Sequence, residues 1–138
     1  ERQDMNNRQK LWSLAKDAFT RAYAPYSRFA VGAAVLTAEG RMYAGCNVEN
    51  VSYPNGTCAE TGAIAAMVAG GDRKIVEIVI VADGQNLITP CGACRQRLKE
   101  FAVPGMLVHL ADVNGIRQTI TLEELLPCSF TDESLRHD

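Results

Sequence analysis

Apolar residues recur at helical spacing near the start of the chain. The apolar positions between residues 11 and 22 are Leu11, Leu14, Ala15, Ala18, Phe19 and Ala22. This spacing places them on one stripe of a helix, where they can face a core. Pro25 disfavours helical geometry at the residue before it. The pattern therefore predicts an amphipathic helix that ends before a turn at residues 24–27.

The middle of the chain contains short apolar segments and one buried helix. Residues 29–36 and 41–48 have the length of strands and are joined by a polar loop, which predicts a hairpin. Residues 58–69 are rich in Ala, Ile and Met and are followed by two glycines, which predicts a mostly buried helix. Residues 75–82 are dense in β-branched side chains and predict a central strand.

The last third of the chain predicts a helix over 91–101, weaker strands at 107–111 and 118–120, and a short helix at 121–126. The resulting order, α-β-β-α-β-α-β-β-α, predicts an α/β fold: a three-layer α/β/α sandwich with a mixed five-stranded sheet. No repeat, low-complexity tract or linker interrupts the sequence. We therefore expect a single domain spanning residues 1–138.

Composition and charge narrow the classes of function. An apolar fraction of 47% and a charged fraction of 22% are typical of a soluble globular protein. The net charge of -2 supplies no basic field for a nucleic-acid backbone, so we expect a small-molecule ligand and no nucleic acid. No apolar run is long enough to cross a bilayer, which predicts no membrane partner. The first ten residues lack the apolar stretch of a secretion signal, which predicts a cytoplasmic protein.

Two short fragments carry the candidate chemistry, and each opens a predicted helix. The first is Thr57-Cys58-Ala59-Glu60 and the second is Pro90-Cys91-Gly92-Ala93-Cys94. Cys91 and Cys94 are three residues apart, so the first helical turn presents both sulfurs to one point. The positive end of a helix dipole favours thiolate, the form that binds zinc. If the two helix ends meet, Cys58 supplies a third sulfur, and a fourth position stays open for water as in catalytic zinc sites.

The other candidate ligands fit this site poorly. An odd count of five cysteines argues against a disulfide framework and favours a metal site. Cys46 and Cys128 are better interpreted as core or surface residues. His109 is interpreted as an ordinary strand residue, and His137 lies in the tail. Cys91 and Cys94 alone could form a thioredoxin-type redox pair, although this alternative leaves Cys58 and Glu60 without a role.

Glu60 has two interpretations. Thr57-x-x-Glu60 is also the pattern of a capping box, in which Glu60 would only cap its own helix. Two residues after a zinc ligand at a helix start, however, its carboxylate can reach a metal-bound water. The neighbouring Cys-x-x-Cys favours the second interpretation, in which Glu60 transfers protons during catalysis.

The two fragments match the signature of zinc-dependent base deaminases, which is a His or Cys, any residue and Glu, followed by Pro-Cys-x-x-Cys. Residues 24–34, 45–53, 91–96 and 123–127 also closely resemble the small cytidine deaminases, and the likeness extends over residues 11–135. The resemblance implies the cytidine deaminase fold, a homotetramer and one Zn²⁺ per chain held by three cysteines. It implies hydrolytic deamination of cytidine and 2′-deoxycytidine to the uridine products and ammonia, as in pyrimidine salvage.

The same resemblance implies roles for further residues. Asn47 and Glu49 would hold the ribose hydroxyls, with Tyr53 near the ribose. Phe29 would pack against the pyrimidine ring, and the backbone at Ala59 would contact the base. Sites in this family are completed across subunits, and Phe130 resembles an aromatic residue that reaches a neighbouring site.

The chain departs from the family pattern in two places. Thr61 stands where the family usually has an Arg directly after the catalytic Glu. In the family, that Arg and the one corresponding to Arg95 hydrogen-bond the zinc thiolates and offset their charge. Three thiolates and one Zn²⁺ sum to -1, so the loss of a cation matters unless another donor substitutes. The second departure is Phe130-Thr131-Asp132, where the family more often has Phe-Gly-Pro.

Three alternatives to cytidine deamination stay open at this point. One is deamination of a related aminopyrimidine nucleoside such as blasticidin S, for which Thr61 is the reason. Another is a non-catalytic zinc or redox module that binds a partner protein. The third, editing of RNA or DNA, is disfavoured by the net negative charge and by the absence of a Lys/Arg tract.

Overall fold

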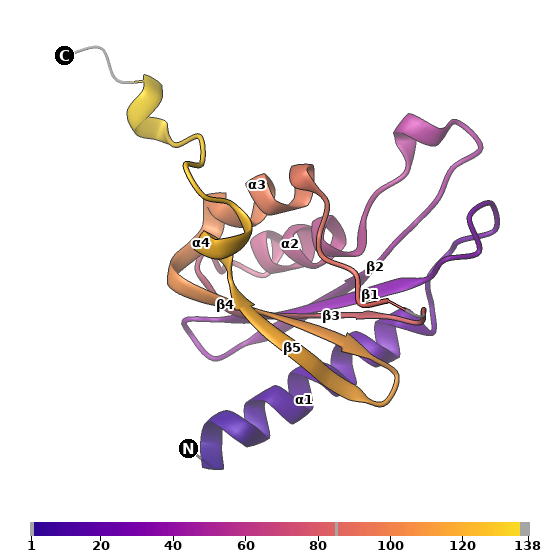
Figure 1. Ribbon diagram of the computed structural model, residues 1–138, viewed down its shortest axis with the longest axis horizontal. Helices are drawn as coiled ribbons and strands as arrows, with labels where there is room; N and C mark the ends of the chain where they lie inside the picture. The colour runs from indigo at the N-terminus through magenta and orange to yellow at the C-terminus, as the bar shows by residue number, and fades with distance from the viewer. Residues whose placement is uncertain (1, 85, 136–138) are drawn as a thin grey trace.

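The computed structural model describes residues 2–84 and 86–135 (Figure 1). In chain order the elements are α1 (Arg2–Phe19), β1 (Val31–Thr37), β2 (Met42–Cys46), the 3₁₀ turn η1 (Tyr53–Asn55), α2 (Ala59–Ala69), β3 (Ile75–Ala82), α3 (Gly92–Phe101), β4 (Ala102–Asp112), β5 (Gly115–Thr121), α4 (Leu122–Leu125) and the 3₁₀ turn η2 (Asp132–Leu135). The predicted order of helices and strands is confirmed. Within the described residues, no helix combines the length and apolarity needed to span a bilayer.

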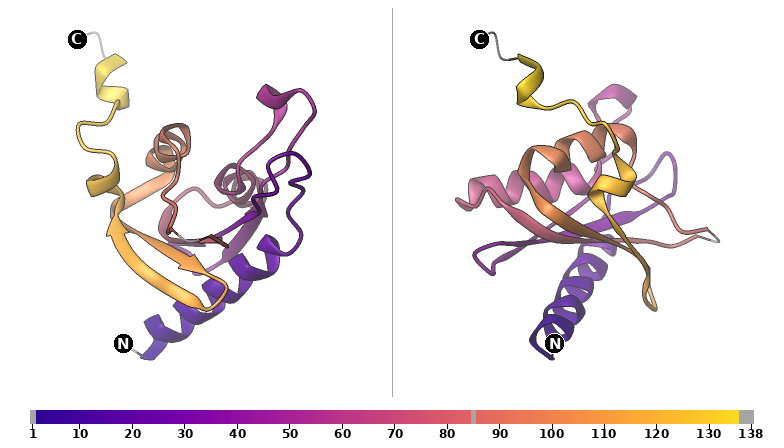
Figure 2. Two further views of the ribbon diagram at one scale, coloured as in Figure 1. Left: turned by 45° about the vertical axis from the view of Figure 1, so that its right-hand side comes forward. Right: turned by 60° about the vertical axis from the view of Figure 1, so that its left-hand side comes forward.

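The five strands form one mixed sheet in the order β2-β1-β3-β4-β5. β3 and β4 are parallel, and the other neighbouring pairs are antiparallel. Helix α1 covers one face of the sheet, while α2, α3 and α4 lie on the other face (Figures 1 and 2). The predicted three-layer α/β/α sandwich is therefore confirmed.

The central strands are buried on both faces because their two side-chain sets enter two separate cores. In β1, Ala33 and Val35 pack in the core beneath α2, whereas Ala34 and Leu36 pack in the core beneath α1. β3 repeats this alternation, with its isoleucines toward α2 and its valines toward α1. Each fully buried branched side chain contributes about 1.5–3 kcal/mol relative to an exposed one. This burial explains why β3 is a nearly unbroken apolar segment.

Two glycines let the helices approach the sheet closely. A Cβ at Gly32 would lie 2.2 Å from the carbonyl oxygen of Ala15 in α1. A Cβ at Gly45 would lie 2.4 Å from the amide nitrogen of Ala63 and 2.6 Å from the carbonyl oxygen of Ala59 in α2. No side chain fits in these gaps. Gly45 therefore allows the first turns of α2, which follow Cys58, to lie directly on β2.

Several predicted boundaries differ from the structure, those of α1 and β4 most of all. Helix α1 starts at Arg2, well before its predicted apolar stripe, and ends at Phe19, three residues before the end of that stripe. β4 starts at Ala102, although the sequence predicts a strand only from residue 107. The early part of β4 contains Pro104 and Gly105, residues that normally argue against a strand. The register with β3 shifts between Ile75 and Glu77, so the strand accommodates them as an irregularity.

A buried carboxylate joins the end of α2 to the β1–β2 hairpin. Asp72 is 2% exposed, and its side chain accepts hydrogen bonds from Arg41, from Thr37 Oγ1 at 3.1 Å and from the Tyr43 hydroxyl at 3.2 Å. These donors, the Arg41 guanidinium above all, hold the pKa of Asp72 below its usual range. The ionised form of Asp72 is thus stabilised by folding.

We expect Asp72 to make the free energy of unfolding depend on pH in the acidic range. A carboxyl whose pKa is lowered by folding stabilises the folded state above its unfolded pKa of about 3.9, and this contribution is lost as pH falls through the folded pKa. We expect Asp72→Asn to be less stable than wild type at pH 7. Its stability should also fall less steeply below about pH 4. Urea unfolding from pH 7 to pH 2.5 measures both effects, and equal slopes in the two proteins would contradict this account.

Candidate zinc and active site

The starts of two helices meet beside the sheet. Cys58 is the N-cap of α2 and Cys91 is the N-cap of α3, both with extended backbone. Neither side chain makes a capping hydrogen bond to its own helix. Cys94 lies in the first turn of α3 and is fully buried. The three sulfurs therefore stand at the positive ends of two helix dipoles, which favour negative charge.

The geometry of these sulfurs fits zinc. The Sγ atoms of Cys58, Cys91 and Cys94 all lie within 4.8 Å of one another. A tetrahedral site with Zn–S bonds of about 2.3 Å requires sulfurs about 3.8 Å apart, so movements of at most about 1 Å close the site. In the part of the chain that the structure describes, no other group of His, Cys, Asp or Glu forms such a cluster. Three protein ligands leave one tetrahedral position for water or substrate.

The three thiols differ in acidity. Burial raises the pKa of the Cys94 thiol and that of the Cys58 thiol. The pKa of Cys91 is lowered, mainly because the Cys94 amide donates to its sulfur. Zinc binds thiolates, so binding must displace protons from the thiols that stay protonated in the free protein.

The remaining cysteines and histidines lie elsewhere. Cys46 is in β2 and Cys128 is an exposed residue after α4, and neither belongs to the cluster. His109 is a fully buried residue of β4, with Nε2 2.6 Å from Glu77 Oε1 and Nδ1 2.8 Å from Thr119 Oγ1. Its interpretation as a strand residue is confirmed. His137 lies outside the described residues.

Glu60 stands in the first turn of α2 and is 5% exposed. The capping-box interpretation of Thr57-x-x-Glu60 is wrong for this helix, because the N-cap is Cys58 and Glu60 is therefore only the second helical residue. Burial raises the pKa of Glu60, and the positive charge of Arg97 opposes this rise. A raised pKa makes a carboxyl a stronger base and a weaker acid, which brings it closer to the range that suits general acid–base catalysis.

A cavity of about 410 Å³ is lined by Glu60 and by two of the three candidate zinc ligands, Cys58 and Cys91. The residues that line it are Val31, Asn47, Val48, Glu49, Tyr53, Gly56, Thr57, Cys58, Ala59, Glu60, Ile88, Thr89 and Cys91. Most of the predicted site residues are thus brought together around one space. The sequence did not identify Ile88 and Thr89, because the loop before α3 has no motif apart from Pro90.

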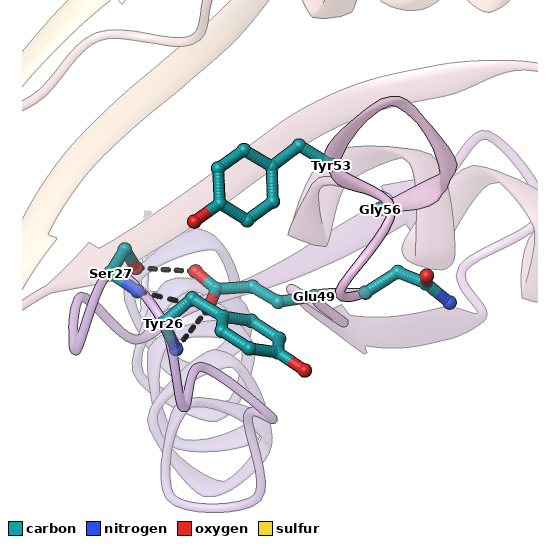
Figure 3. Close-up of a pocket in the computed structure, with 6 residues that line it drawn as sticks. Tyr26, Ser27, Glu49, Tyr53 and Gly56 are labelled. Atoms are coloured by element: carbon teal, nitrogen blue, oxygen red, sulfur yellow. Dashed lines mark hydrogen bonds between the residues drawn. The ribbon is translucent and has the colours of Figure 1, made fainter.

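Asn47 and Glu49 hold the segment that precedes β1. The Asn47 side chain accepts from the Val31 amide at 2.8 Å and donates to the Phe29 carbonyl at 2.9 Å. The Glu49 carboxylate accepts from the amides of Tyr26 and Ser27, at 2.9 Å and 3.1 Å, and from the Ser27 hydroxyl (Figure 3).

The hydrogen bonds from Ser27 keep the pKa of Glu49 below its usual range. Glu49 is therefore an ionised acceptor at the edge of the cavity. The sequence did not reveal this contact, since it joins residues that are more than twenty positions apart. A second, smaller cavity of about 290 Å³ lies beside this carboxylate, between Tyr26 and Tyr53 (Figure 3).

The two predicted phenylalanines are placed differently. Phe29 is half-buried, and its ring lies next to Gly84 at the edge of the site. Among the described residues that line the main cavity, Phe29 is not included. Phe130 is 59% exposed, and its carbonyl accepts from Gln96 at 3.1 Å. It belongs to the segment after α4, which extends away from the sheet and helices (Figures 1 and 2).

The contacts of Arg95 in the structure differ from those that the family resemblance implies. Arg95 donates to oxygen atoms, namely the carbonyls of Pro90 and Leu125 at 2.7 Å and Thr89 Oγ1 at 2.9 Å. Among the described residues, the guanidinium that reaches a cysteine sulfur is that of Arg97, whose Nη1 lies 3.9 Å from Cys94 Sγ. Arg97 is three residues after Cys94, and this helical spacing is the signal that could have found it.

Fold and site together define a class of protein. An open three-cysteine site for zinc, with a buried carboxylate beside it in a nucleoside-sized cavity, is typical of zinc-dependent hydrolytic deaminases. The sequence model of the family described as "Cytidine and deoxycytidylate deaminase zinc-binding region" matches residues 5–110. The chain belongs to this family.

Relatives of known name agree with this assignment. The chain is similar to the cytidine deaminase of Sporosarcina psychrophila, with 41% identity over 94% of this chain and 95% of the relative. It is also 44% identical to the cytidine deaminase of Mycobacterium tuberculosis, over 84% of each chain. The crystal structure of cytidine deaminase from Burkholderia pseudomallei superposes with a TM-score of 0.82 and 41% identity, covering 88% of this chain and 98% of that one.

Zinc content should depend on three of the five cysteines. We expect the purified protein to contain about one zinc per chain, and Cys58→Ser or Cys91→Ser to lose most of it, because serine is a poor ligand for a soft metal site. Cys46→Ser is the matched control, since Cys46 lies outside the cluster, and it should keep its zinc. Elemental analysis after gel filtration measures the ratio. Full zinc in Cys58→Ser would show that this residue is no ligand.

Proposed function

We propose that this protein catalyses the hydrolytic deamination of cytidine, and of 2′-deoxycytidine, to uridine or 2′-deoxyuridine and ammonia. The observation that carries the proposal is the position of Glu60. Its buried carboxylate stands two residues after the zinc ligand Cys58 and lines the same cavity as Cys58 and Cys91. In this proposal, Glu60 is the group that moves protons at the metal site.

Cys58, Cys91 and Cys94 would hold the zinc, which would supply a Lewis acid that makes water nucleophilic near neutral pH. Glu60 takes a proton from the attacking water and gives it to ring N3, which makes C4 of the base electrophilic. After the C4–O bond has formed, Glu60 takes the remaining proton of the former water from the new C4–OH group and delivers it to the amino group. The C4–N bond then breaks and ammonia leaves. The raised pKa of Glu60 suits a group that must act first as base and then as acid.

The cavity suits a nucleoside in size and in polar groups. Its volume of about 410 Å³ falls in the range of small-molecule sites, which is about 300–1,000 Å³. In this proposal Glu49 and Asn47 face the ribose hydroxyls, with Tyr53 beside the sugar and the Ala59 backbone against the base. Phe29 contacts the pyrimidine ring from the edge of the site, where Asn47 holds its backbone.

We further propose that the chain folds as a single domain and forms homotetramers in the cytoplasm. Several large apolar side chains near the cavity mouth are exposed, including Val51 and Tyr53, and such patches favour association. Phe130, on its extended segment, is available to a neighbouring subunit. The reduced cysteines that the zinc site needs are typical of cytoplasmic proteins.

Glu60→Gln tests the proton-transfer role. We expect this variant to keep its zinc and to lose cytidine turnover by about 10²–10⁴-fold, because glutamine cannot exchange protons. Loss of the cytidine absorbance measures turnover, and elemental analysis measures zinc. Turnover within tenfold of wild type in a fully zinc-loaded variant would exclude Glu60 as the proton carrier.

The substrate is tested with wild-type protein on cytidine, 2′-deoxycytidine, cytosine and blasticidin S. We expect both nucleosides to be deaminated much faster than the free base, since cytosine lacks the sugar that Asn47 and Glu49 would bind. Faster turnover of blasticidin S than of cytidine would favour the antibiotic-deaminase alternative. A zinc-loaded protein that turns over none of the four compounds would favour a non-catalytic module.

A further inference from the structure

The metal site carries an excess of negative charge that the protein must balance. Three thiolates and one Zn²⁺ sum to -1, and the carboxylate of Glu60 lies beside them. Cys94 is the fully buried ligand, so its sulfur is the one least stabilised by water. Buried charge without a partner is costly. Hydrogen-bond donors at Cys94 should therefore matter most for zinc affinity.

We propose that Arg97, together with the Thr61 hydroxyl, donates to the sulfur of Cys94 and so stabilises the zinc-bound thiolate of this ligand. Arg97 Nη1 lies 3.9 Å from Cys94 Sγ, and Thr61 Oγ1 lies 4.0 Å from the same sulfur. The first donor comes from α3 and the second from α2. Against a thiolate, which has no proton, both groups can only donate.

Arg97 is the cation suited to this task because of its place on the helix. It stands one turn after Cys94, where residues three apart face the same side of a helix. Arg95 cannot serve equally, since the carbonyls of Pro90 and Leu125 hold its guanidinium at 2.7 Å. Arg95 therefore ties the loop before α3 to the end of α4, and Arg97 provides the charge at sulfur.

Thr61 explains why this arrangement is possible. Its hydroxyl is neutral and short, so it leaves the charge of the cluster unbalanced while occupying little space. A cation on α3 can then reach Cys94 without repulsion from a second cation on α2. In this interpretation, the positive charge that position 61 lacks is supplied from position 97 on the other helix.

The proposal rests on the zinc site of the proposed function, and it is tested by zinc affinity instead of activity. Arg97→Met removes the charge and keeps an unbranched side chain with good helix propensity. Lys99→Met is the matched control, because Lys99 lies on the same helix but its charge acts on Glu123 and not on the cysteine cluster. Each variant is titrated against a chromogenic zinc chelator at one fixed pH and ionic strength, with circular dichroism as a check of folding.

We expect Arg97→Met to bind zinc about 10-fold more weakly than wild type, within the range of about 10–100-fold found for outer-shell partners. Lys99→Met should stay within about twofold. Arg97→Lys should lose less affinity than Arg97→Met, because lysine keeps the positive charge but lacks the planar set of N–H donors of a guanidinium. The double variant Thr61→Arg/Arg97→Met should recover most of it, since a cation on α2 then faces the same thiolate. A merely structural role of Arg97 would not be rescued from another helix.

Two results would overturn the proposal: unchanged zinc affinity in Arg97→Met, or an equal loss in Lys99→Met. If Arg97→Met fails to fold, the zinc affinities of Arg97→Lys and of the double variant are compared instead. A double variant that binds zinc more weakly than Arg97→Lys would count against the proposal. Failure of the proposed function gives a different result. In that case wild type and the variants would bind zinc in the predicted order of affinities, but zinc-loaded wild type would not turn over cytidine.

Discussion

The meeting of two helix starts at one end of the sheet is the constraint on which this site depends. α2 reaches that point because Gly45 lets it lie directly on β2, and α3 reaches it through the loop that follows β3. Cys58 and Cys91 are the N-caps of these helices, so their sulfurs extend beyond the helix ends toward each other. A shift of either helix along the sheet would separate ligands that must share one ion.

The same arrangement decides the electrostatics of the site. Helix starts attract negative charge, yet burial raises the pKa of Cys94 and of Glu60. The site thus combines helix dipoles that favour thiolates with burial that weakens the acidity of Glu60. Arg97 lies where its charge acts on both Cys94 and Glu60. The reactivity of the carboxylate and the stability of the metal site are therefore linked.

The polar residues around the cavity have structural as well as binding roles. Asn47 satisfies backbone groups on both sides of Ala30, and Glu49 accepts from the turn at Tyr26 and Ser27. These contacts hold the segment that bears Phe29, because that segment forms no strand of its own. A substitution at either residue would disturb the cavity wall together with any contact to the sugar.

The sequence by itself determined the order of the elements, the mixed sheet, the candidate zinc ligands and Glu60, since these follow from local periodicity and short motifs. It did not determine the extension of β4 back to Ala102, whose pairing with Ile75 continues the strand across the irregular stretch at Pro104 and Gly105. The family resemblance implied a thiolate contact for Arg95, whereas the structure places Arg97 at Cys94. It also did not reveal the contacts of Glu49 with Ser27. Only tertiary structure decided these features, because each depends on where separate elements pack and which donors that packing leaves within reach.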